Sequence, residues 1–577
     1  MSKKLELTWI GKENKINVEP RILIEIPELS NISAIVNSTS SFDNMLIHGD
    51  NLLALKALQS DFSRKIKCIY IDPPYNTGAA FEHYDDNLEH STWLNLMNER
   101  IRILWDLLTD DGLLAIQIDD NEFARLYLLL CEICHEKNIK VICVKMSEAT
   151  GVKMASVNKA GSIPKLKEYI ILAKKDGIRN LNLEKIPKEK WDKEYKTYCS
   201  NISDDELMLL KDILSKEDAT ENEILIADNL LKNIRFSNVN DVAMKEIGSN
   251  ANEEWCFNNA HRIVQFVTLT GGARDIAIQK KYQLLNNLPS AFCIQTKKGK
   301  MYAIRADFNT ETSLSRCKIL FADQYLTVNP GDLWVDIKTT GLDNEGYVDF
   351  KKSKKPERLI RRIIRLNTKE NDIVLDSFLG SGTTCAVAHK MGRKWIGIEM
   401  GDHAYSHCKV RLDKVISGED NGGISKQINW QGGGGYRFYE LAPTLIEEDA
   451  FGQPIINSNY NATMLASAIA KHEGYNYNPD ENCYWKQSKN DNNSFLYVTT
   501  QHVNSDVIES IKTELKDDEF LLIVCKSYDT NCNFGNRNIN IKKIPQSLLK
   551  NCEFGVDNYN LNIINPPVYE EEEEDDE

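Results

Sequence analysis

Hydrophobic and polar positions alternate along this chain in a way that predicts two blocks of strands and helices separated by a long insert. In the first block, NMLIH and KIKCIYID predict buried strands, residues 93–108 predict a helix with one apolar stripe, and GLLAIQID predicts another strand. KVICVKM and KEYIILAKK predict a closing hairpin. The second block runs from DIVLD through a helix to RKWIGIE. This α/β alternation is typical of a parallel sheet covered by helices.

The segment between the blocks lacks that alternation. It mixes charged helical stretches with pieces such as AFCIQTKKGKMYAIRADF, so we expect a separate mixed α/β domain. Four consecutive glycines, 432–435, predict a hinge before a C-terminal α+β domain. The expected domains are an N-terminal extension (1–43), the first block (44–176), the insert (177–329), the second block (330–440), a C-terminal domain (441–568) and a disordered acidic tail (569–577).

Length and composition exclude several classes of protein. A chain of 577 residues with 42% hydrophobic and 27% charged positions is a globular protein of several domains, not a small binding module. Its last eight residues, all acidic, carry about half of the net charge of −15, which leaves room for local basic surfaces. We find no secretory signal and no long apolar run, and the 14 cysteines follow no disulfide framework. We therefore expect a cytoplasmic chain with free thiols, no membrane span and no metal site.

Asp72-Pro73-Pro74-Tyr75 directly follows a predicted strand, at the edge where open α/β sheets bind ligands. The two prolines make a stiff turn whose acceptors are the Asp72 carboxylate and both proline carbonyls. Such acceptors can hold the two hydrogens of an exocyclic amine of a nucleobase, and Tyr75 offers a ring for base stacking. The base would have to flip out of duplex DNA. The alternative is a proline turn that caps the strand, with Tyr75 in a local core.

DSFLGSGTT, from Asp376 to Thr384, follows the strand DIVL and precedes a helix, and Glu399 ends the next strand. Glycines let the backbone approach a ligand, and an acid about 17 residues past Gly382 can bind ribose hydroxyls. A dinucleotide fingerprint would place a third glycine where Cys385 stands. S-adenosylmethionine, which has a ribose but no phosphate, therefore fits better than NAD. The sequence contains no Walker A motif, so it encodes no ATPase.

At these residues the chain resembles amino-methyltransferases of DNA, with DPPY as their catalytic motif and DSFLGSG as their cofactor loop. DPPY comes first and a large insert follows, as in the β group. LIHGDNLLALKAL, DPPYNTG, AIQIDDNE, KKPERLI and GGGGYRFYEL are similar to modification subunits of type III restriction-modification systems. The resemblance implies a Rossmann-like S-adenosylmethionine-dependent methyltransferase domain built from two sequence halves, with an inserted target-recognition domain.

The resemblance also implies roles for individual residues. The target amine would meet Asp72, Pro73, Pro74 and Tyr75, and the cofactor would meet Asp50, Asp376, Phe378, Gly380, Gly382, Thr383 and Glu399. Within that set, Glu399 would bind the ribose, and Asp50 would lie near the adenine amino group unless it only caps a turn or helix. KEYI, at 167–170, departs from the usual His-Glu-Tyr, which argues against a role there in holding the base.

The implied product is adenine methylated at N6 in double-stranded DNA. The implied assembly is a homodimer that also binds an ATP-dependent restriction subunit. Residues 351–365 are strongly basic, and we expect Lys351, Lys352, Lys354 and Arg361 to contact DNA phosphates; the alternative is a solvated helix face. Three other functions stay open: methylation of cytosine N4, non-catalytic DNA recognition by a subunit that keeps the fold, and methylation of RNA or of a protein glutamine.

Overall fold

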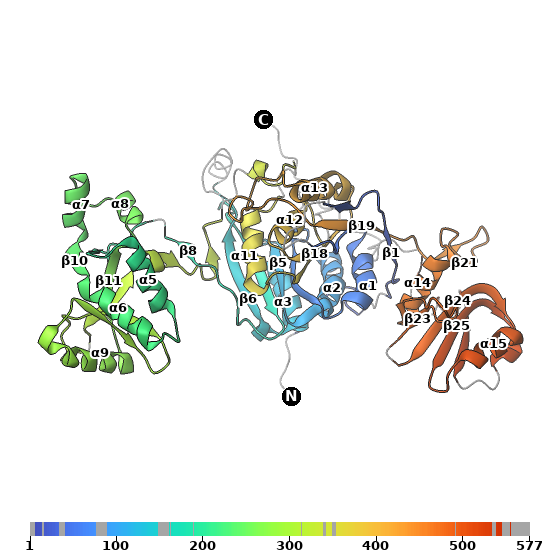
Figure 1. Cartoon of the computed structure of the whole chain (residues 1–577). Helices are drawn as coiled ribbons and strands as arrows, with labels where there is room; N and C mark the ends of the chain where they lie inside the picture. Colours follow the sequence, from blue (N-terminus) through green and yellow to red (C-terminus); the bar gives the residue numbers. More distant parts are fainter. Residues whose placement is uncertain are drawn as a thin grey trace. The chain divides into compact units, whose positions relative to one another are not determined.

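The computed structural model describes residues 6–13, 17–33, 41–76, 89–147, 161, 163–188, 190–312, 314–337, 342–348, 354–490, 492–533, 538–544, 548 and 554. Lys351, Lys352 and the acidic tail lie outside these residues. The chain divides into two units, one formed by Met1–Leu183 with Gly331–Glu577 and the other by Glu184–Pro330 (Figure 1). Ile178 and Leu181 pack against the core of the first unit, so the insert begins later than residue 177.

The first unit is built on one sheet of eleven strands, in the order β1-β19-β3-β18-β17-β4-β5-β7-β6-β16, with β2 also paired to β19. These strands are β1 Leu23–Glu25, β2 Asn31–Ile32, β3 Asn44–His48, β4 Ile66–Ile71, β5 Leu108–Ile118, β6 Ile139–Lys145, β7 Lys167–Lys174, β16 Leu333–Trp334, β17 Ile373–Asp376, β18 Lys394–Glu399 and β19 Gly435–Leu441. Neighbours from β19 to β5 run parallel. Strands β6 and β7 form the antiparallel hairpin expected from the sequence.

Helices cover both faces of this sheet. One face carries α1 Asn51–Phe62, α2 His90–Leu107 and α3 Phe123–Cys134; the other carries α11 Glu357–Asn367, α12 Thr383–Lys390, the π-helix η4 Ala404–Lys409 and α13 Val410–Ser417. Side chains of a strand alternate between faces, so Ile69 and Ile71 of β4 join the first core, whereas Cys68 and Tyr70 join the second. The α/β architecture expected from the alternation is confirmed.

The two sequence blocks lie side by side in this sheet. Strand β4, from the first block, pairs in parallel with β17, from the second, with Cys68 opposite Val374 and Ile69 opposite Leu375. The insert therefore leaves and re-enters the first unit without interrupting the sheet. This pairing places the ends of two strands that are remote in sequence next to each other.

The glycine run at 432–435 is not a hinge. Gly435 opens β19, and a side chain there would bring its Cβ within 2.6 Å of the Asn31 carbonyl oxygen. Gly434 has a φ of +79°, and its Cβ would lie 3.1 Å from the Ser41 carbonyl oxygen. Glycines stand here because two backbones approach closely, so the hinge expected from the sequence is wrong.

Helix α11 is mostly buried, although it lies in the basic segment. Leu359, Ile360, Ile363 and Ile364 are fully buried, and the guanidinium of Arg362 is 2% exposed and pairs with Asp336. The apolar side of this helix is therefore buried, whereas Arg358, Arg361 and Arg365 lie on its more exposed side. A second buried group of charges joins α11 to α12, α13 and the loop beyond α13, and it consists of Glu357, Lys390, Arg411 and Asp420.

The second unit has its own antiparallel sheet in the order β10-β9-β11-β14-β13-β12. Its elements are β9 Thr197–Ser200, α5 Asp204–Ser215, α6 Glu221–Asn233, β10 Arg235–Asn238, α7 Val239–Ile247, α8 Glu253–Asn258, β11 Ile263–Thr268, α9 Gly271–Gln283, β12 Ala291–Gln295, β13 Met301–Arg305, β14 Arg316–Phe321 and α10 Ala322–Tyr325. Strands β8 Ile186–Pro187 and β15 Thr327–Val328 pair where the chain enters and leaves this unit. Leu207, Leu210 and Leu231 lie in a core separate from that of the large sheet.

Residues after Leu441 add a further α+β part to the first unit. It contains β20 Ile446–Glu448, β21 Pro454–Ile456, α14 Ala462–Glu473, α15 Ser505–Glu514 and a sheet of β22 Asn476–Tyr477, β23 Ser488–Lys489, β24 Ser494–Val503, β25 Phe520–Tyr528 and β26 Ile539–Lys543. Lys471 of α14 donates to the Ala57 carbonyl of α1 at 2.6 Å. The thirteen described cysteines are free, and no helix of the described part is long and apolar enough to cross a membrane.

Candidate active site

Four carboxylates lie where four adjacent parallel strands end. Asp50 follows β3, Glu399 ends β18, Asp376 ends β17 and Asp72 follows β4. The strands are neighbours in that order and all run parallel, so their carboxyl ends share one edge of the sheet. The chain leads away in opposite directions from β4 and β17, and such a switch point is where open α/β sheets bind ligands. The structure thus brings both sequence motifs to one place.

The turn after β4 uses two of its three expected acceptors inside the protein. The partly exposed Asp72 carboxylate accepts from the Tyr75 hydroxyl at 2.7 Å through Oδ1. The Pro74 carbonyl accepts from the Trp93 indole at 2.8 Å, which anchors the turn to α2 and corrects the expectation that this carbonyl faces a target amine. The Pro73 carbonyl has no hydrogen bond to any described residue. Asp72 and Pro73 therefore remain as the pair of acceptors.

A second carboxylate reaches the same turn, and sequence reasoning missed it. Glu168 of β7 places Oε2 2.9 Å from the Tyr75 hydroxyl and accepts from the Gln117 amide of β5, whose oxygen accepts from the Tyr70 hydroxyl at 2.6 Å. Tyr75 has one hydroxyl proton and so cannot donate to Asp72 and Glu168 at once. Both short contacts form together only when one of the two carboxyl groups carries a proton.

Burial raises the pKa of Asp72 above its ordinary value of 3.8; the Lys355 charge opposes this shift and the Glu168 charge adds to it. Burial lowers the pKa of Lys355, but the charges of Asp72 and Glu168 outweigh it and leave that pKa above 10.5. Burial also raises the pKa of the Tyr75 hydroxyl well above 10, so Tyr75 stays a donor. The turn thus combines the Lys355 ammonium with an Asp72 carboxylate whose pKa is raised above its ordinary value.

One signal in the sequence pointed to Glu168. It is an acid near the start of an otherwise apolar strand, in the KEYI segment that the resemblance had already drawn attention to. The departure from His-Glu-Tyr affects the first position of that motif and leaves Glu168 in place. Lys355 likewise belongs to KKPERLI, but nothing in that run showed that its ammonium reaches Asp72.

The loop after β17 wraps around Glu399. The Gly380 amide donates to Glu399 Oε2 at 2.7 Å, and the Met400 amide donates to Oε1 at 2.8 Å. Gly380 and Gly382 have φ values of +56° and +79°, a conformation that glycine adopts without strain. The Ser377 hydroxyl is buried and has no hydrogen-bond partner among the described residues. A carboxylate oxygen can accept more than one hydrogen bond. The Glu399 carboxylate could therefore also accept hydrogen bonds from the hydroxyls of a nucleoside, in addition to those from the backbone amides.

Two side chains of this loop have roles inside the protein. Phe378 is partly buried against the core that contains α1 and α2. Thr383 is buried, and its hydroxyl accepts from Arg411 Nη1 at 2.7 Å and lies 3.0 Å from the Ser381 hydroxyl. The expectation that the Thr383 side chain binds a cofactor is therefore corrected: its hydroxyl joins the loop to the buried charges of Glu357 and Arg411.

Asp376 should make the protein less stable as the pH rises toward neutrality. Burial raises the pKa of Asp376 to about 7, and the charges of Asp72 and Glu399 add to this, whereas hydrogen bonds from Thr384 and Phe378 oppose it. The folded protein then holds a proton that the unfolded chain has lost, so stability falls as the pH rises. Between pH 5 and 7 the free energy of unfolding should fall by about 2 kcal/mol more for the unmodified protein than for Asp376→Asn. Urea denaturation at several pH values measures this difference, and equal slopes would contradict it.

Asp50 caps α1. Its Oδ1 accepts from the Leu52 and Leu53 amides at 2.9 and 3.1 Å, and its Oδ2 pairs with Arg100 at 3.2 Å. The capping alternative is therefore realised, and the carboxylate still lies at the same sheet edge as Glu399, because Gly49 donates to the Glu399 carbonyl.

Removing the Asp50 cap should lower stability. We expect Asp50→Ala to reduce the free energy of unfolding by about 1 kcal/mol, and Asp50→Asn, which keeps an accepting oxygen, to retain most of it. Urea denaturation of both variants checks this. Equal losses in the two variants would show that the charge and its pairing with Arg100, and not the cap, are what matters.

The described basic residues at 354–365 face the protein more than solvent. Lys354 donates to the Glu345 and Val348 carbonyls at 2.7 and 3.1 Å, and Arg361 is partly buried. Arg358 is exposed and pairs with Asp336. The Lys354 ammonium is therefore engaged within its own segment. Of the two described residues that the sequence analysis expects to contact DNA, Lys354 and Arg361, only Arg361 remains a candidate.

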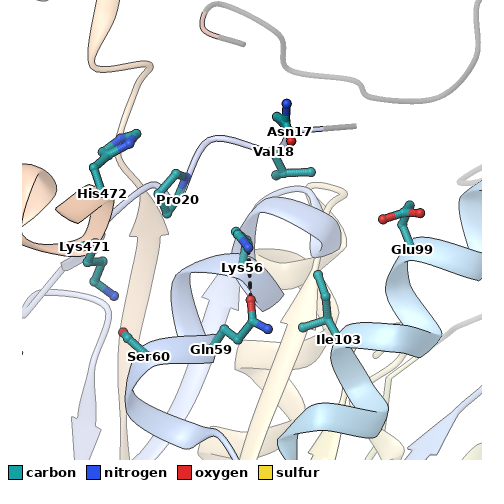
Figure 2. A pocket seen from close by; sticks show the side chains of 10 residues that line it. All are labelled: Asn17, Val18, Pro20, Lys56, Gln59, Ser60, Glu99, Ile103, Lys471 and His472. Carbon is teal, nitrogen blue, oxygen red and sulfur yellow. Dashed lines mark hydrogen bonds between the residues drawn. The ribbon is translucent and has the colours of Figure 1, made fainter. Parts of the chain in front are cut away.

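A pocket of about 440 Å³ is lined by none of the four carboxylates (Figure 2). It lies between the segment that precedes β1, helices α1 and α2, and helix α14. Its lining residues are Asn17, Val18, Pro20, Lys56, Gln59, Ser60, Glu99, Ile103, Lys471 and His472. The Lys56 ammonium donates to the Gln59 side chain at 3.1 Å. No residue of either motif lines it, so we do not place the chemistry there.

Residues 66–409, more than half of the chain, match the model of a DNA methylase family. The chain is 36% identical over 415 residues to a probable type III restriction-modification enzyme HindVI Mod subunit of Haemophilus influenzae, covering 70% of this chain and 54% of that protein. It is 26% identical over 473 residues to the EcoPI Mod subunit of Escherichia phage P1, covering 72% and 64%. The chain thus spans only half to two thirds of the length of these relatives. Among solved structures, the cytosine-N4-specific PvuII DNA methyltransferase aligns over 68% of this chain and 92% of its own at 14% identity, and its TM-score of 0.31 is too low to carry an argument.

Proposed function

Since this chain belongs to the DNA methylase family, we propose that it transfers a methyl group from S-adenosylmethionine to N6 of an adenine flipped out of double-stranded DNA. The observation that carries the proposal is the meeting of Asp72 and Glu399 at one edge of four parallel strands. An acceptor turn for an amine and a glycine loop for a nucleoside lie there together. We propose the Rossmann-like arrangement of two sequence halves on the same ground.

The cofactor would lie over the loop after β17. Glu399 would accept the ribose hydroxyls, Phe378, Gly380 and Gly382 would line the methionine and adenosyl parts, and Asp50 would lie near the adenine. The Ser377 hydroxyl, which no described residue bonds, and the positive φ values of both glycines fit such a ligand. When bound, S-adenosylmethionine supplies a methyl group already activated by its sulfonium charge.

The target base would meet the turn after β4. The Asp72 carboxylate and the Pro73 carbonyl would accept the two amine hydrogens, and the base would stack on Tyr75, a contact worth about 1–3 kcal/mol. Holding the amine at near-attack distance can remove roughly 7–11 kcal/mol of barrier. The acceptors also stabilise the positive charge that develops on the nitrogen. The proton that the amine releases can pass to Asp72, which accepts from the Tyr75 hydroxyl at 2.7 Å.

We further propose that the chain is the modification subunit of a type III restriction-modification system. Both relatives described above are Mod subunits. Such a subunit would recognise its DNA sequence through the unit formed by Glu184–Pro330 and would form a homodimer. It would also bind an ATP-dependent restriction subunit, because this chain has no Walker A sequence. Action on the DNA of its own cell would place it in the cytoplasm.

Labelled S-adenosylmethionine and unmodified genomic DNA test the reaction. After incubation, the DNA is digested to nucleosides and analysed by mass spectrometry. We expect the label in N6-methyldeoxyadenosine. Label in N4-methyldeoxycytidine would correct the acceptor, whereas unlabelled DNA would contradict the activity. Modified-base sequencing of the product then gives the recognition sequence.

A further inference from the structure

The side chain of Lys355 reaches into the turn after β4. Its Nζ lies 2.9 Å from Asp72 Oδ2, 3.7 Å from Glu168 Oε2 and 4.9 Å from the centre of the Tyr75 ring. The side chain is 14% exposed. A cation that lies over an aromatic face and beside a carboxylate is well bound. The Lys355 ammonium therefore occupies the space between Asp72 and the Tyr75 ring.

Lys355 uses the same two groups that the target base would use. The base would donate one of its two amine hydrogens to Asp72 and stack on the Tyr75 ring. The ammonium is also an N–H donor, and it already covers both groups. A ring stacked on Tyr75 with its amine on Asp72 Oδ2 would occupy the volume that Nζ fills.

We propose that the Lys355 ammonium is an internal occupant of the target-amine site and that a flipped base must displace it. This inference rests on the proposed function. It gives the site a donor to exchange for the base, so that a cation compensates the Asp72 charge when no base is present.

The backbone around Lys355 allows this exchange through the side chain alone. Pro356, with a φ of −63°, precedes the first residue of α11. Glu357 is fully buried, bonds Lys390 and Arg411, and accepts from the Ile424 amide. The segment is therefore fixed on its C-terminal side, whereas a lysine stem has four rotatable bonds. Rotation about them moves Nζ away from Asp72 without disturbing α11.

Displacement of the Lys355 ammonium would also raise the pKa of Asp72. Lys355 lowers the pKa of Asp72, which burial and Glu168 raise. When the ammonium leaves, this opposing effect weakens and Asp72 binds a proton more readily. The exchange would thus prepare the carboxylate for the proton that the methylated amine gives up.

Removing the ammonium should open the site to a nucleoside. We compare the whole chain, Lys355→Ala, Lys355→Arg and the control Lys369→Ala, which removes an exposed lysine just beyond α11. Equilibrium dialysis with labelled 2′-deoxyadenosine at pH 8 measures affinity. We expect Lys355→Ala to bind at least about fivefold more tightly than the unmodified chain, because a site open for only a fraction of the time loses apparent affinity in proportion. Lys355→Arg, which keeps the cation, and Lys369→Ala should show no gain.

An affinity of Lys355→Ala equal to or below that of the unmodified chain, including no measurable binding, would overturn the proposal. The labelled-DNA assay separates this from the proposed function, because an unmodified chain that transfers no methyl group contradicts the activity whatever the dialysis shows. A tenfold fall in the turnover of Lys355→Ala with unchanged nucleoside affinity would make Lys355 a positioning residue for Asp72 and would also overturn it.

Discussion

Asp72→Asn is expected to lower methyl transfer by about a thousandfold, the loss typical of removing one group that stabilises developing charge. The asparagine amide would offer a donor where the turn needs an acceptor, and no negative charge would offset the positive charge on the amine. Affinity for S-adenosylmethionine should not change, because Asp72 lies on the turn after β4 and the proposed cofactor loop follows β17. Single-turnover assays and calorimetric titration measure the two quantities separately.

Unfolding should not explain that loss. Burial raises the pKa of Asp72, which means that its charge is costly in the folded protein, so the neutral asparagine should not reduce the melting temperature. Asp110→Asn is a suitable control, because Asp110 is 77% exposed and lies in β5 of the same sheet. Retention of more than about a tenth of the activity by Asp72→Asn would show that a positioned acceptor contributes less than such groups usually do.

Glu399→Gln is expected to weaken binding of S-adenosylmethionine by about a hundredfold, or roughly 3 kcal/mol, because a charged acceptor of two ribose hydroxyls is lost. The same carboxylate accepts from the Gly380, Met400 and Gly401 amides, so the substitution also loosens the loop. Calorimetric titration gives the affinity, and Glu448→Gln, at an exposed position of β20, serves as the control.

A cofactor analogue without ribose hydroxyls separates the two causes. If Glu399 binds the ribose, the unmodified chain should lose most of its affinity for the analogue, and Glu399→Gln should lose little more, because the two changes remove the same interaction. If the two losses of affinity add up instead, the effect of Glu399→Gln comes from the loosened loop, and Glu399 does not bind the ribose.

Much of the site follows from short stretches of sequence. Asp72 and Tyr75 stand in one tetrapeptide behind an apolar strand, and Asp376 and Gly382 stand in one loop between a strand and a helix. Each of these units can be predicted from neighbouring residues alone, because strand, turn and loop preferences act between residues close in sequence. The resemblance to DNA amino-methyltransferases, drawn from these units, is confirmed by the family match over residues 66–409.

Other features depend on contacts that no local pattern contains. Glu168 reaches Tyr75 only because β7 pairs antiparallel with β5 in a register that sets Ile170 opposite Gln117. The Pro74 carbonyl is taken by Trp93, which belongs to α2. The basic run at 351–365 predicted a DNA-binding surface, but Arg362 is buried and forms an ion pair with Asp336. A charge is buried when a partner compensates it, and the partner is not visible in the run itself.

The order of apolar and polar residues by itself determined that this chain contains two α/β blocks, that acids stand at the ends of their strands, and that a proline turn and a glycine loop follow two of these strands. The tertiary structure alone decided that β4 lies beside β17, so that turn and loop share an edge, and that the Lys355 ammonium rests on Asp72. Strand alternation and turn chemistry act between neighbours in sequence and leave a pattern there. Sheet order and ion pairing depend on contacts between residues far apart in the chain. These contacts form only when the chain folds, so no local stretch of sequence shows them.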